Sequence, residues 1–293
     1  VIMNYTLESA ELTIAVNPIG MELSSIKSKL TGAEYMWQAD PTIWKGQAPV
    51  LFPIVGALKD GFTFINDEKY KMPKHGLVRN SSKPELIKQT ENCLLFRLTW
   101  DQETLQHYPF KFQLEISFIL SGKTLEIKHQ ITNLGNEPMP YFLGGHPAFN
   151  CPLLPGEIYE DYRIQFPQQE TDGTWLIDEQ GLIKNEPKPF IENSNIIPLS
   201  KDLFDDDALI FKHLKSKEAT LSHKEKGAIL TVKFDDFDYL GIWAKPAAPY
   251  VCIEPWLGIA DSSDSNHEFT KKEGLSLVEP NQSETKSYSI IVA

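Results

Sequence analysis

The sequence has few cysteines, no long apolar run and no excess of positive charge, and each lack excludes a class of protein. Its three cysteines, Cys93, Cys151 and Cys252, lie far apart and form no CxxC pair. We therefore expect free thiols in a reducing compartment rather than a disulfide framework or a structural zinc site. No stretch approaches the roughly 18 apolar residues of a membrane span, and the acidic, polar start is unlike a signal peptide. The sequence predicts a cytoplasmic protein without a membrane partner.

Basic side chains are outnumbered by acidic ones, 28 to 40, which gives a formal net charge of −12. A field of that sign repels phosphate backbones, so nucleic acid is not an expected partner. The net charge still allows a local basic pocket that holds a small anion. The oligomeric state is open at this point, with a homodimer as one option.

Motifs for several common chemistries are also missing. There is no GxSxG for a serine nucleophile, and neither GxxxxGK[ST] nor GxGxxG for a nucleotide. Metal sites usually have ligands close in sequence, and the chain has no HxH or HExxH. What remains is acid–base catalysis by imidazole and carboxylate, for which we expect neither metal nor cofactor.

Alternation of apolar and polar residues dominates what the sequence does contain. Residues 110–120 and 125–131 alternate on either side of a "SGKT" turn, which predicts a β-hairpin with one buried face. Similar patterns predict hairpins over residues 22–37 and 61–72, two strands over 228–244, and a final strand over 285–293.

Helical patterns are scarce and short. One covers Asp40 to Trp44, with Asp40 as N-cap and Pro41 at the first helical position, and another covers Ser200 to Phe204. Residues 150–200 are rich in Pro, Glu and Asn and are interpreted as long surface loops. The density of strands predicts an all-β fold, a large antiparallel β-sandwich in a single domain over residues 1–293.

Four segments combine a loop or strand end with a side chain that could do chemistry. They carry His75 before Gly76, His146 in "GGHPAFN", the aspartates 205–207 before an apolar strand, and Glu254 before Pro255. Each also has a structural interpretation: a hydrogen-bonded loop histidine, a solvated turn, or a salt-bridged glutamate. Cys151 and Cys252 read as packing thiols.

Strand parity adds information about Glu254. If Val251 and Ile253 face the interior, then Tyr250, Cys252 and Glu254 face the other way and could form the floor of a polar cleft. We expect the strand to end at Pro255, where the sheet opens toward a loop.

Five segments in order resemble the aldose 1-epimerase (galactose mutarotase-like) family, and most of all its LacX-type bacterial branch. They are "LFPIVGALKDG", "KHGLVR", "GGHPAFN", "DDDALIF" and "VCIEPWLG", and the likeness extends from "GAEYMW" to the C-terminal strand. The resemblance implies an antiparallel β-sandwich with an open sugar cleft. It also implies interconversion of the α and β anomers of a monosaccharide without metal or cofactor.

The resemblance assigns roles to matched residues. Glu254 corresponds to the base that takes the proton of the anomeric hydroxyl, and His146 to the acid that protonates the ring oxygen. His75 corresponds to a second histidine that hydrogen-bonds the sugar near the reacting centre. Asp207 is the best match to the hydroxyl-binding aspartate, with Asp205 and Asp206 close enough to confuse the register.

One departure concerns the arginine that family members carry in the "FP…" loop, where this chain has Ala57. Lys59 or Arg79 could supply the missing donor, and Trp243, Trp256 and Phe149 are candidate stacking surfaces. Three alternatives stay open: a hexose 6-phosphate mutarotase, a non-catalytic carbohydrate-binding protein, and a glycan lyase or hydrolase. The first needs a basic cluster, for which the candidates are Lys45, Lys59, Lys74 and Arg79.

Overall fold

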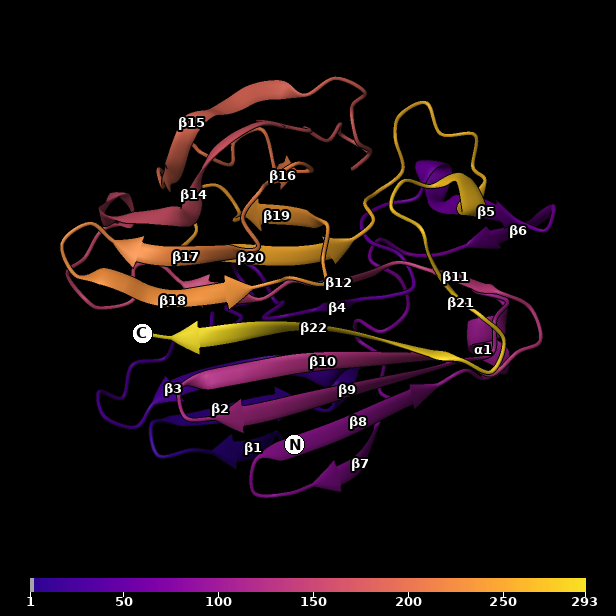
Figure 1. The fold of residues 1–293 in the computed structure, drawn as a ribbon, viewed down its shortest axis with the longest axis horizontal. Helices are drawn as coiled ribbons and strands as arrows, with labels where there is room; N and C mark the ends of the chain where they lie inside the picture. Colours follow the sequence, from indigo (N-terminus) through magenta and orange to yellow (C-terminus); the bar gives the residue numbers. More distant parts are fainter. Residues whose placement is uncertain (1–2) are drawn as a thin grey trace.

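Two large antiparallel sheets contain most of the strands in this computed structural model, which describes residues 3–293 (Figure 1). The nine-stranded sheet has the spatial order β15 (Lys188–Pro198), β14 (Tyr162–Thr174), β17 (Glu218–His223), β18 (Gly227–Lys233), β22 (Ser283–Val292), β10 (Thr124–Asn133), β9 (Phe112–Ser121), β8 (Cys93–Thr99) and β7 (Glu85–Gln89). The six-stranded sheet has the order β16 (Leu209–Phe211), β19 (Tyr239–Trp243), β20 (Tyr250–Leu257), β12 (Leu143–Gly145) and β4 (Val50–Leu51), with β13 (Ala148–Asn150) also paired to β20.

Three smaller sheets and a few short helices complete the described chain. The sheets are β1 (Tyr5–Glu8), β2 (Leu12–Asn17) and β3 (Glu22–Ser28); β5 (Phe62–Ile65) and β6 (Glu68–Lys71); and β11 (Met139–Tyr141) and β21 (Ser276–Val278). The single α-helix among residues 3–293 is α1 (Gln102–Leu105), and the 3-10 turns are η1 (Ile19–Met21), η2 (Lys59–Gly61), η3 (Tyr159–Asp161) and η4 (Phe269–Lys271). No helix within these residues is both long and apolar enough to cross a membrane.

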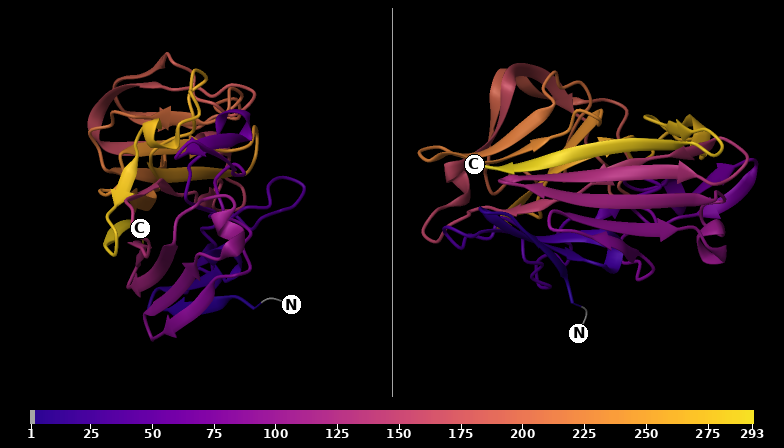
Figure 2. Two further views of the ribbon diagram at one scale, coloured as in Figure 1. Left: turned by 90° about the vertical axis from the view of Figure 1, so that its right-hand side faces the viewer. Right: turned by 60° about the horizontal axis from the view of Figure 1, so that its bottom comes forward.

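The large sheets pack face to face, as the turned views show (Figure 2). Phe52, just after β4, packs edge-on against Phe112 of β9 at 5.2 Å between ring centroids, and Tyr288 of β22 lies against Gly145 of β12. Burying an aromatic or aliphatic side chain of this kind contributes about 1.5–3 kcal/mol. The buried apolar residues form one contiguous cluster. The predicted antiparallel β-sandwich is confirmed, and a single domain remains our proposal.

The strongest alternation patterns form the strands that they predict. β9 and β10 pair as a hairpin with Leu120 opposite Leu125, and their inward side chains are buried at every second position. The hairpin of β5 and β6 and the final strand β22 are likewise confirmed.

The two strands predicted over residues 228–244 are confirmed as β18 and β19, which enter different sheets. The hairpin predicted over residues 22–37 is confirmed in part. After β3 the chain turns back and pairs with it through the Lys27–Glu34 bridge, whereas Met36 bridges to Phe149 of β13.

Other expectations are wrong. Residues 40–44 and 200–204 form turns rather than helices. The supposed loops of residues 150–200 contain β14 and β15. The first part of β14 alternates, with Tyr162, Ile164 and Phe166 buried, whereas most side chains of β15 are exposed or half-buried.

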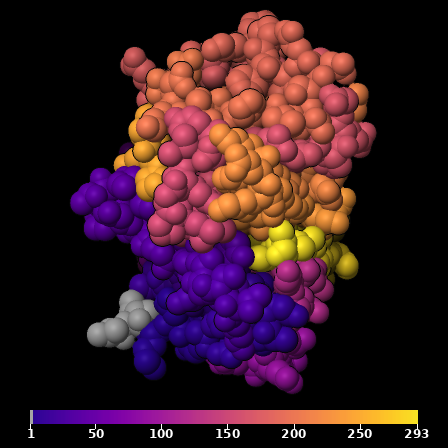
Figure 3. All heavy atoms as spheres, turned by 90° about the vertical axis from the view of Figure 1, so that its left-hand side faces the viewer, coloured from indigo at the N-terminus to yellow at the C-terminus, as the bar shows by residue number. Residues whose placement is uncertain are grey.

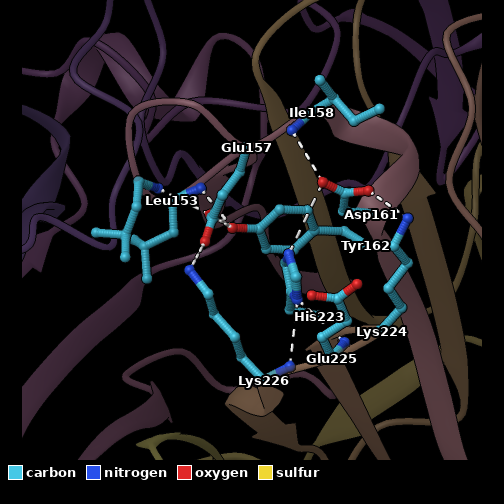
Figure 4. A network of polar contacts seen from close by, with 10 residues as sticks. Leu153, Glu157, Ile158, Asp161, Tyr162, His223, Lys224, Glu225 and Lys226 are labelled. Atoms are coloured by element: carbon cyan, nitrogen blue, oxygen red, sulfur yellow. Dashed lines mark hydrogen bonds and ion pairs between the residues drawn. The ribbon is translucent and has the colours of Figure 1, made fainter.

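Hydrogen bonds and an ion pair connect the chain just after β13 to the turn between β17 and β18 (Figure 4). The Tyr162 hydroxyl accepts a hydrogen bond from the Leu153 N–H at 2.9 Å and contacts the Glu157 carboxylate, which also pairs with Lys226. His223 Nδ1 accepts the backbone N–H of Lys226 at 3.2 Å. These contacts anchor the segment that leaves the centre of the smaller sheet.

Residues 283–292 lie between strands that come from much earlier in the chain. β22 pairs with β18 on one side and with β10 on the other. Seen from the left-hand side of Figure 1, the yellow C-terminal residues separate an upper region of later residues from a lower region of earlier ones (Figure 3). The strand therefore joins the two halves of the nine-stranded sheet.

Gly76 is needed where the segment after β6 crosses the loop after β4. Its φ is +85°, and a Cβ there would lie 2.1 Å from the carbonyl oxygen of Phe52. Leu77 N–H donates to that same oxygen at 2.8 Å, so the backbone cannot move away without losing the bond. Only glycine fits both the left-handed conformation and the close approach.

We expect Gly76→Ala to destabilise the protein by several kcal/mol, because about 1–2 kcal/mol of left-handed strain adds to the clash with Phe52. Gly156→Ala is the matched control, since Gly156 has a φ of +88° with nothing within 4 Å of an added Cβ. Gly156→Ala should destabilise the protein only by the left-handed strain of about 1–2 kcal/mol. Urea unfolding of both variants measures the difference, and equal destabilisation would show that the close approach has no importance.

Candidate functional site

Most of the residues predicted for the site line one cavity of about 150 Å³, whereas Lys59 and Phe149 do not. Strands β19 and β20 of the six-stranded sheet carry Trp243, Glu254 and Trp256. The loops before β13 and β16 carry His146 and Asp207, and the segment between β6 and β7 carries His75 and Arg79. The predicted residues in the cavity are His75, Arg79, His146, Asp207, Trp243, Glu254 and Trp256.

Glu254 lies in the middle of β20, opposite Gly241 of β19, and its side chain is buried. The predicted end of this strand at Pro255 is wrong. The strand continues to Leu257 because pairing on both sides of the proline, through Glu254 and Trp256, keeps the backbone extended. As parity requires, Glu254 and Trp256 share one face, and both reach the cavity.

His146 occupies a two-residue break between β12 and β13, both of which pair with β20. The segment "GGHPAFN" is therefore mostly strand rather than loop. Neither preceding glycine has a positive φ. They are required by space, because a Cβ on Gly144 would lie 2.8 Å from the Trp256 ring, and one on Gly145 would lie 2.6 Å from Tyr288.

The two central side chains contact each other. His146 Nε2 lies 3.3 Å from Glu254 Oε2, and both side chains are almost fully buried. Burial raises the pKa of Glu254 to about 8, a rise that the nearby Lys74 ammonium opposes. Burial also lowers the pKa of His146 to about 3. Burial therefore favours the uncharged form of each group, a protonated carboxyl beside a neutral imidazole.

His75 presents a fixed face to the cavity. Its Nδ1 accepts the Gly56 N–H at 3.1 Å, and its own backbone N–H donates to the Gly56 carbonyl at 2.9 Å. Burial and then the charge of a protonated His146 lower the pKa of His75 well below its usual value. The neutral ring therefore carries its hydrogen on Nε2, which can donate to a ligand oxygen.

Lys74 and Arg79 place positive charge at one side of the cavity. Both lower the pKa values of His75 and His146, and Lys74 opposes the rise at Glu254. Sequence reasoning considered Lys74 only as part of a basic cluster. The sequence did contain a signal that Lys74 belongs to the site, because Lys74 directly precedes His75.

Lys59 does not reach the cavity. Its Nζ donates to the Ser265 carbonyl at 3.1 Å, and its backbone N–H donates to the Asp261 carboxylate at 2.9 Å. Asp261 also forms a buried ion pair with Lys272, and its N–H binds the Ala57 carbonyl at 2.9 Å. Lys59 thus helps to fix the loop that holds His75, and Arg79 is the one of the two proposed donors that lines the site.

Aromatic rings enclose the pair formed by His146 and Glu254. Trp44 stacks on His146 with ring centroids 5.2 Å apart, and Trp243 meets the same imidazole edge-on at 5.7 Å. Trp44 ends the segment that was predicted as a short helix, and sequence reasoning gave its side chain no part in the site. The Trp256 indole also lowers the pKa of Glu254, although its buried N–H has no hydrogen bond of normal geometry within residues 3–293. Phe149 is fully buried and does not line the cavity.

Asp207 lines the cavity from the turn before β16, with a φ of +73°. Asp205 and Asp206 line only an adjoining depression, in which Asp207 also takes part. Of the three aspartates, Asp207 is therefore the one placed to meet a ligand beside Glu254, whose pKa its charge helps to raise.

The arrangement can move protons without exchanging them with solvent. Transfer of the carboxyl proton from Glu254 to His146 turns a neutral pair into a carboxylate base and an imidazolium acid. The two groups then act on one ligand held between aromatic walls, with His75 as a neutral donor. Cys252 is also buried near this pair, behind the residues that line the cavity.

Known proteins are similar to this chain over nearly its whole length. Residues 3–290 match the family described as aldose 1-epimerase. Two LacX proteins of Lactococcus lactis subsp. lactis, one plasmid-encoded and one chromosomal, are each 37% identical over 299 residues, covering 99% of both chains. A galactose mutarotase related enzyme from Lactobacillus acidophilus has a TM-score of 0.92 and 33% identity, covering 99% of this chain and 97% of its own. A galactose mutarotase-like protein from Lactobacillus casei has a TM-score of 0.92 and 25% identity, covering 99% and 100%.

Proposed function

The chain belongs to the aldose 1-epimerase family, and we propose that it interconverts the α and β anomers of a free hexose, with Glu254 as base and His146 as acid. Membership makes it an isomerase of the mutarotase type. The observation that supports the residue roles is the 3.3 Å approach of these two buried side chains, both of which line the cavity together with Trp44, Trp243 and Trp256.

The proposed reaction uses the carboxyl proton of Glu254. When the Glu254 proton has moved to His146, the carboxylate takes the proton of the sugar O1 hydroxyl. The C1–O5 bond breaks, and the imidazolium gives its proton to O5, which yields the open-chain aldehyde. Rotation about C1–C2 presents the other face of the carbonyl, and the same two groups close the ring with their roles exchanged.

Other cavity residues bind and orient the sugar in this proposal. The His75 Nε2–H donates to a sugar oxygen near the reacting centre, and Asp207 accepts from a ring hydroxyl. Trp44, Trp243 and Trp256 present apolar faces to the ring and limit water. The charge of Lys74 favours the ionised form of Glu254 once the sugar hydroxyls replace solvent.

A second candidate substrate is a hexose 6-phosphate. Lys74 and Arg79 both line the cavity, and this pair of cations suits a phosphate ester. The acidic residues of the adjoining depression, Asp205 and Asp206, oppose an anion on that side. Rates on the free sugars and on their 6-phosphates decide between the two.

Magnetisation-transfer NMR on glucose, galactose and their 6-phosphates tests the function. We expect the wild-type protein to accelerate anomer exchange and His146→Gln to lower kcat/KM by about 10²- to 10⁴-fold, the usual contribution of a positioned acid or base. His107→Gln is the control, because His107 binds the Lys71 carbonyl away from the cavity. A folded protein that binds hexoses without accelerating exchange would instead be a carbohydrate-binding protein, and chain cleavage of a glycan would indicate a lyase or hydrolase.

A further inference from the structure

Three potential metal ligands meet beside the cavity, and the proposed reaction uses only two of them. His146, Cys252 and Glu254 each offer one donor atom, and these atoms all lie within 4.8 Å of one another. All three side chains are buried. The sequence analysis missed this group because it searched for metal ligands close in sequence. His146 lies far in sequence from Cys252 and Glu254, and the pairing of β13 with β20 brings them together.

The backbone that carries the three ligands is firmly positioned. Cys252 and Glu254 are two residues apart on β20 and therefore share a face. Ala148 of β13 pairs with Cys252, and the Ile253 N–H donates to the Pro147 carbonyl at 3.2 Å. His146 is thereby held opposite Cys252 and Glu254. A cation would find a largely preformed site.

The distances suit zinc. Zinc binds nitrogen and oxygen at about 2.0–2.2 Å and sulfur at about 2.3 Å, so tetrahedral ligand atoms lie on the order of 3.3–3.6 Å apart. His146 Nε2 and Glu254 Oε2 are already 3.3 Å apart. The Cys252 sulfur lies within 4.8 Å of a donor atom of each of these residues, so zinc binding needs these side chains to move closer together. A thiolate and an imidazole favour zinc over magnesium or calcium.

We propose that His146, Cys252 and Glu254 form a binding site for a zinc ion that inhibits the enzyme. Binding of the ion releases the carboxyl proton of Glu254 and the thiol proton of Cys252 to solvent. The ion then occupies lone pairs of Glu254 and His146, so neither can exchange a proton with a sugar. The fourth ligand position is available to water or to a sugar hydroxyl from the cavity. The inhibition rests on the proposed mutarotase function, whereas zinc binding rests on the three side chains alone.

Cys252→Ser tests the site, and Cys151→Ser is the matched control, because Cys151 is a buried free thiol outside the group. Zinc affinity is measured by competition with a chromogenic chelator, with no sugar present. We expect one zinc per wild-type chain and an affinity at least about 100-fold lower in Cys252→Ser, since losing even an outer-shell partner costs 10- to 100-fold. Cys151→Ser should bind as the wild type does.

Cobalt(II) gives a readout that needs no variant. Cobalt bound to the wild-type protein should show a thiolate-to-metal charge-transfer band and the visible spectrum of a tetrahedral site. Absence of the charge-transfer band, or equal zinc affinity of the wild type and Cys252→Ser, would overturn the proposal.

Activity gives a separate readout. Zinc should abolish anomer exchange by the wild-type protein, and a chelator should restore it. Cys252→Ser should need about 100-fold more zinc than the wild type for half-maximal inhibition, with each protein compared with its own activity in the absence of metal. Full wild-type activity with zinc bound would contradict the inhibitory role. Cysteine-dependent zinc binding in a protein without mutarotase activity would leave the site in place and reject the proposed function.

Discussion

Glu254→Gln is expected to lower kcat/KM for anomer exchange by about 10³-fold, within the 10²- to 10⁴-fold range of a positioned acid or base. Glutamine has nearly the same size and can occupy the same buried position, but it cannot take a proton from O1. The glutamine also cannot supply the carboxyl proton that Glu254 can pass to His146, whose Nε2 lies 3.3 Å away. Magnetisation-transfer NMR on the preferred hexose measures the loss.

The control for this loss is Glu284→Gln. The Glu284 carboxylate accepts the Tyr141 hydroxyl at 2.6 Å, outside the cavity, and glutamine can still accept that bond. Its activity should stay within a few-fold of the wild type. If Glu254→Gln kept similar activity while folded, Glu254 would not be the base.

Glu254→Gln should also stabilise the fold at alkaline pH. Burial raises the pKa of Glu254 from 4.5 to about 8, so the native state holds this proton more tightly than the unfolded state does. Stability from this group is fully present below pH 4.5 and is lost as the pH rises to about 8. At pH 9 we expect the free energy of unfolding of Glu254→Gln to exceed that of the wild type by a few kcal/mol, since one pKa unit corresponds to about 1.4 kcal/mol.

Urea unfolding at pH 4.5, 7 and 9 measures this effect, which should grow steadily with pH. Glu192→Gln, at an exposed position on β15, supplies the comparison and should show no such trend. A constant difference between Glu254→Gln and the wild type across this range would mean that Glu254 ionises in the fold as easily as in the unfolded chain. The native enzyme would in that case keep its base without a cost in stability.

Much of the site was predictable because its residues stand next to strong local signals. His75 precedes a glycine that a tight crossing requires, and Glu254 lies on a strand whose parity is plain in the sequence. Alternation likewise predicted β9 and β10, since each buries one face and exposes the other. These signals depend only on neighbouring residues.

The rest depends on contacts between distant segments. Trp44 reaches His146 from just after the turn of residues 41–43, and the local sequence does not indicate this contact. β15 is an edge strand whose side chains are mostly exposed or half-buried, held by backbone pairing to β14 that leaves little trace in the sequence. Cys252 comes near His146 only when β13 pairs with β20.

The position of β22 has a consequence for synthesis of the protein. The nine-stranded sheet has four strands on each side of β22, and all eight of them precede it in the chain. During translation the two four-stranded halves can therefore form first, each with an unpaired edge, β18 or β10, that could join another nascent chain. The nine-stranded sheet can form completely only after residues 283–292 have left the ribosome, so β18 and β10 lack this central partner until then.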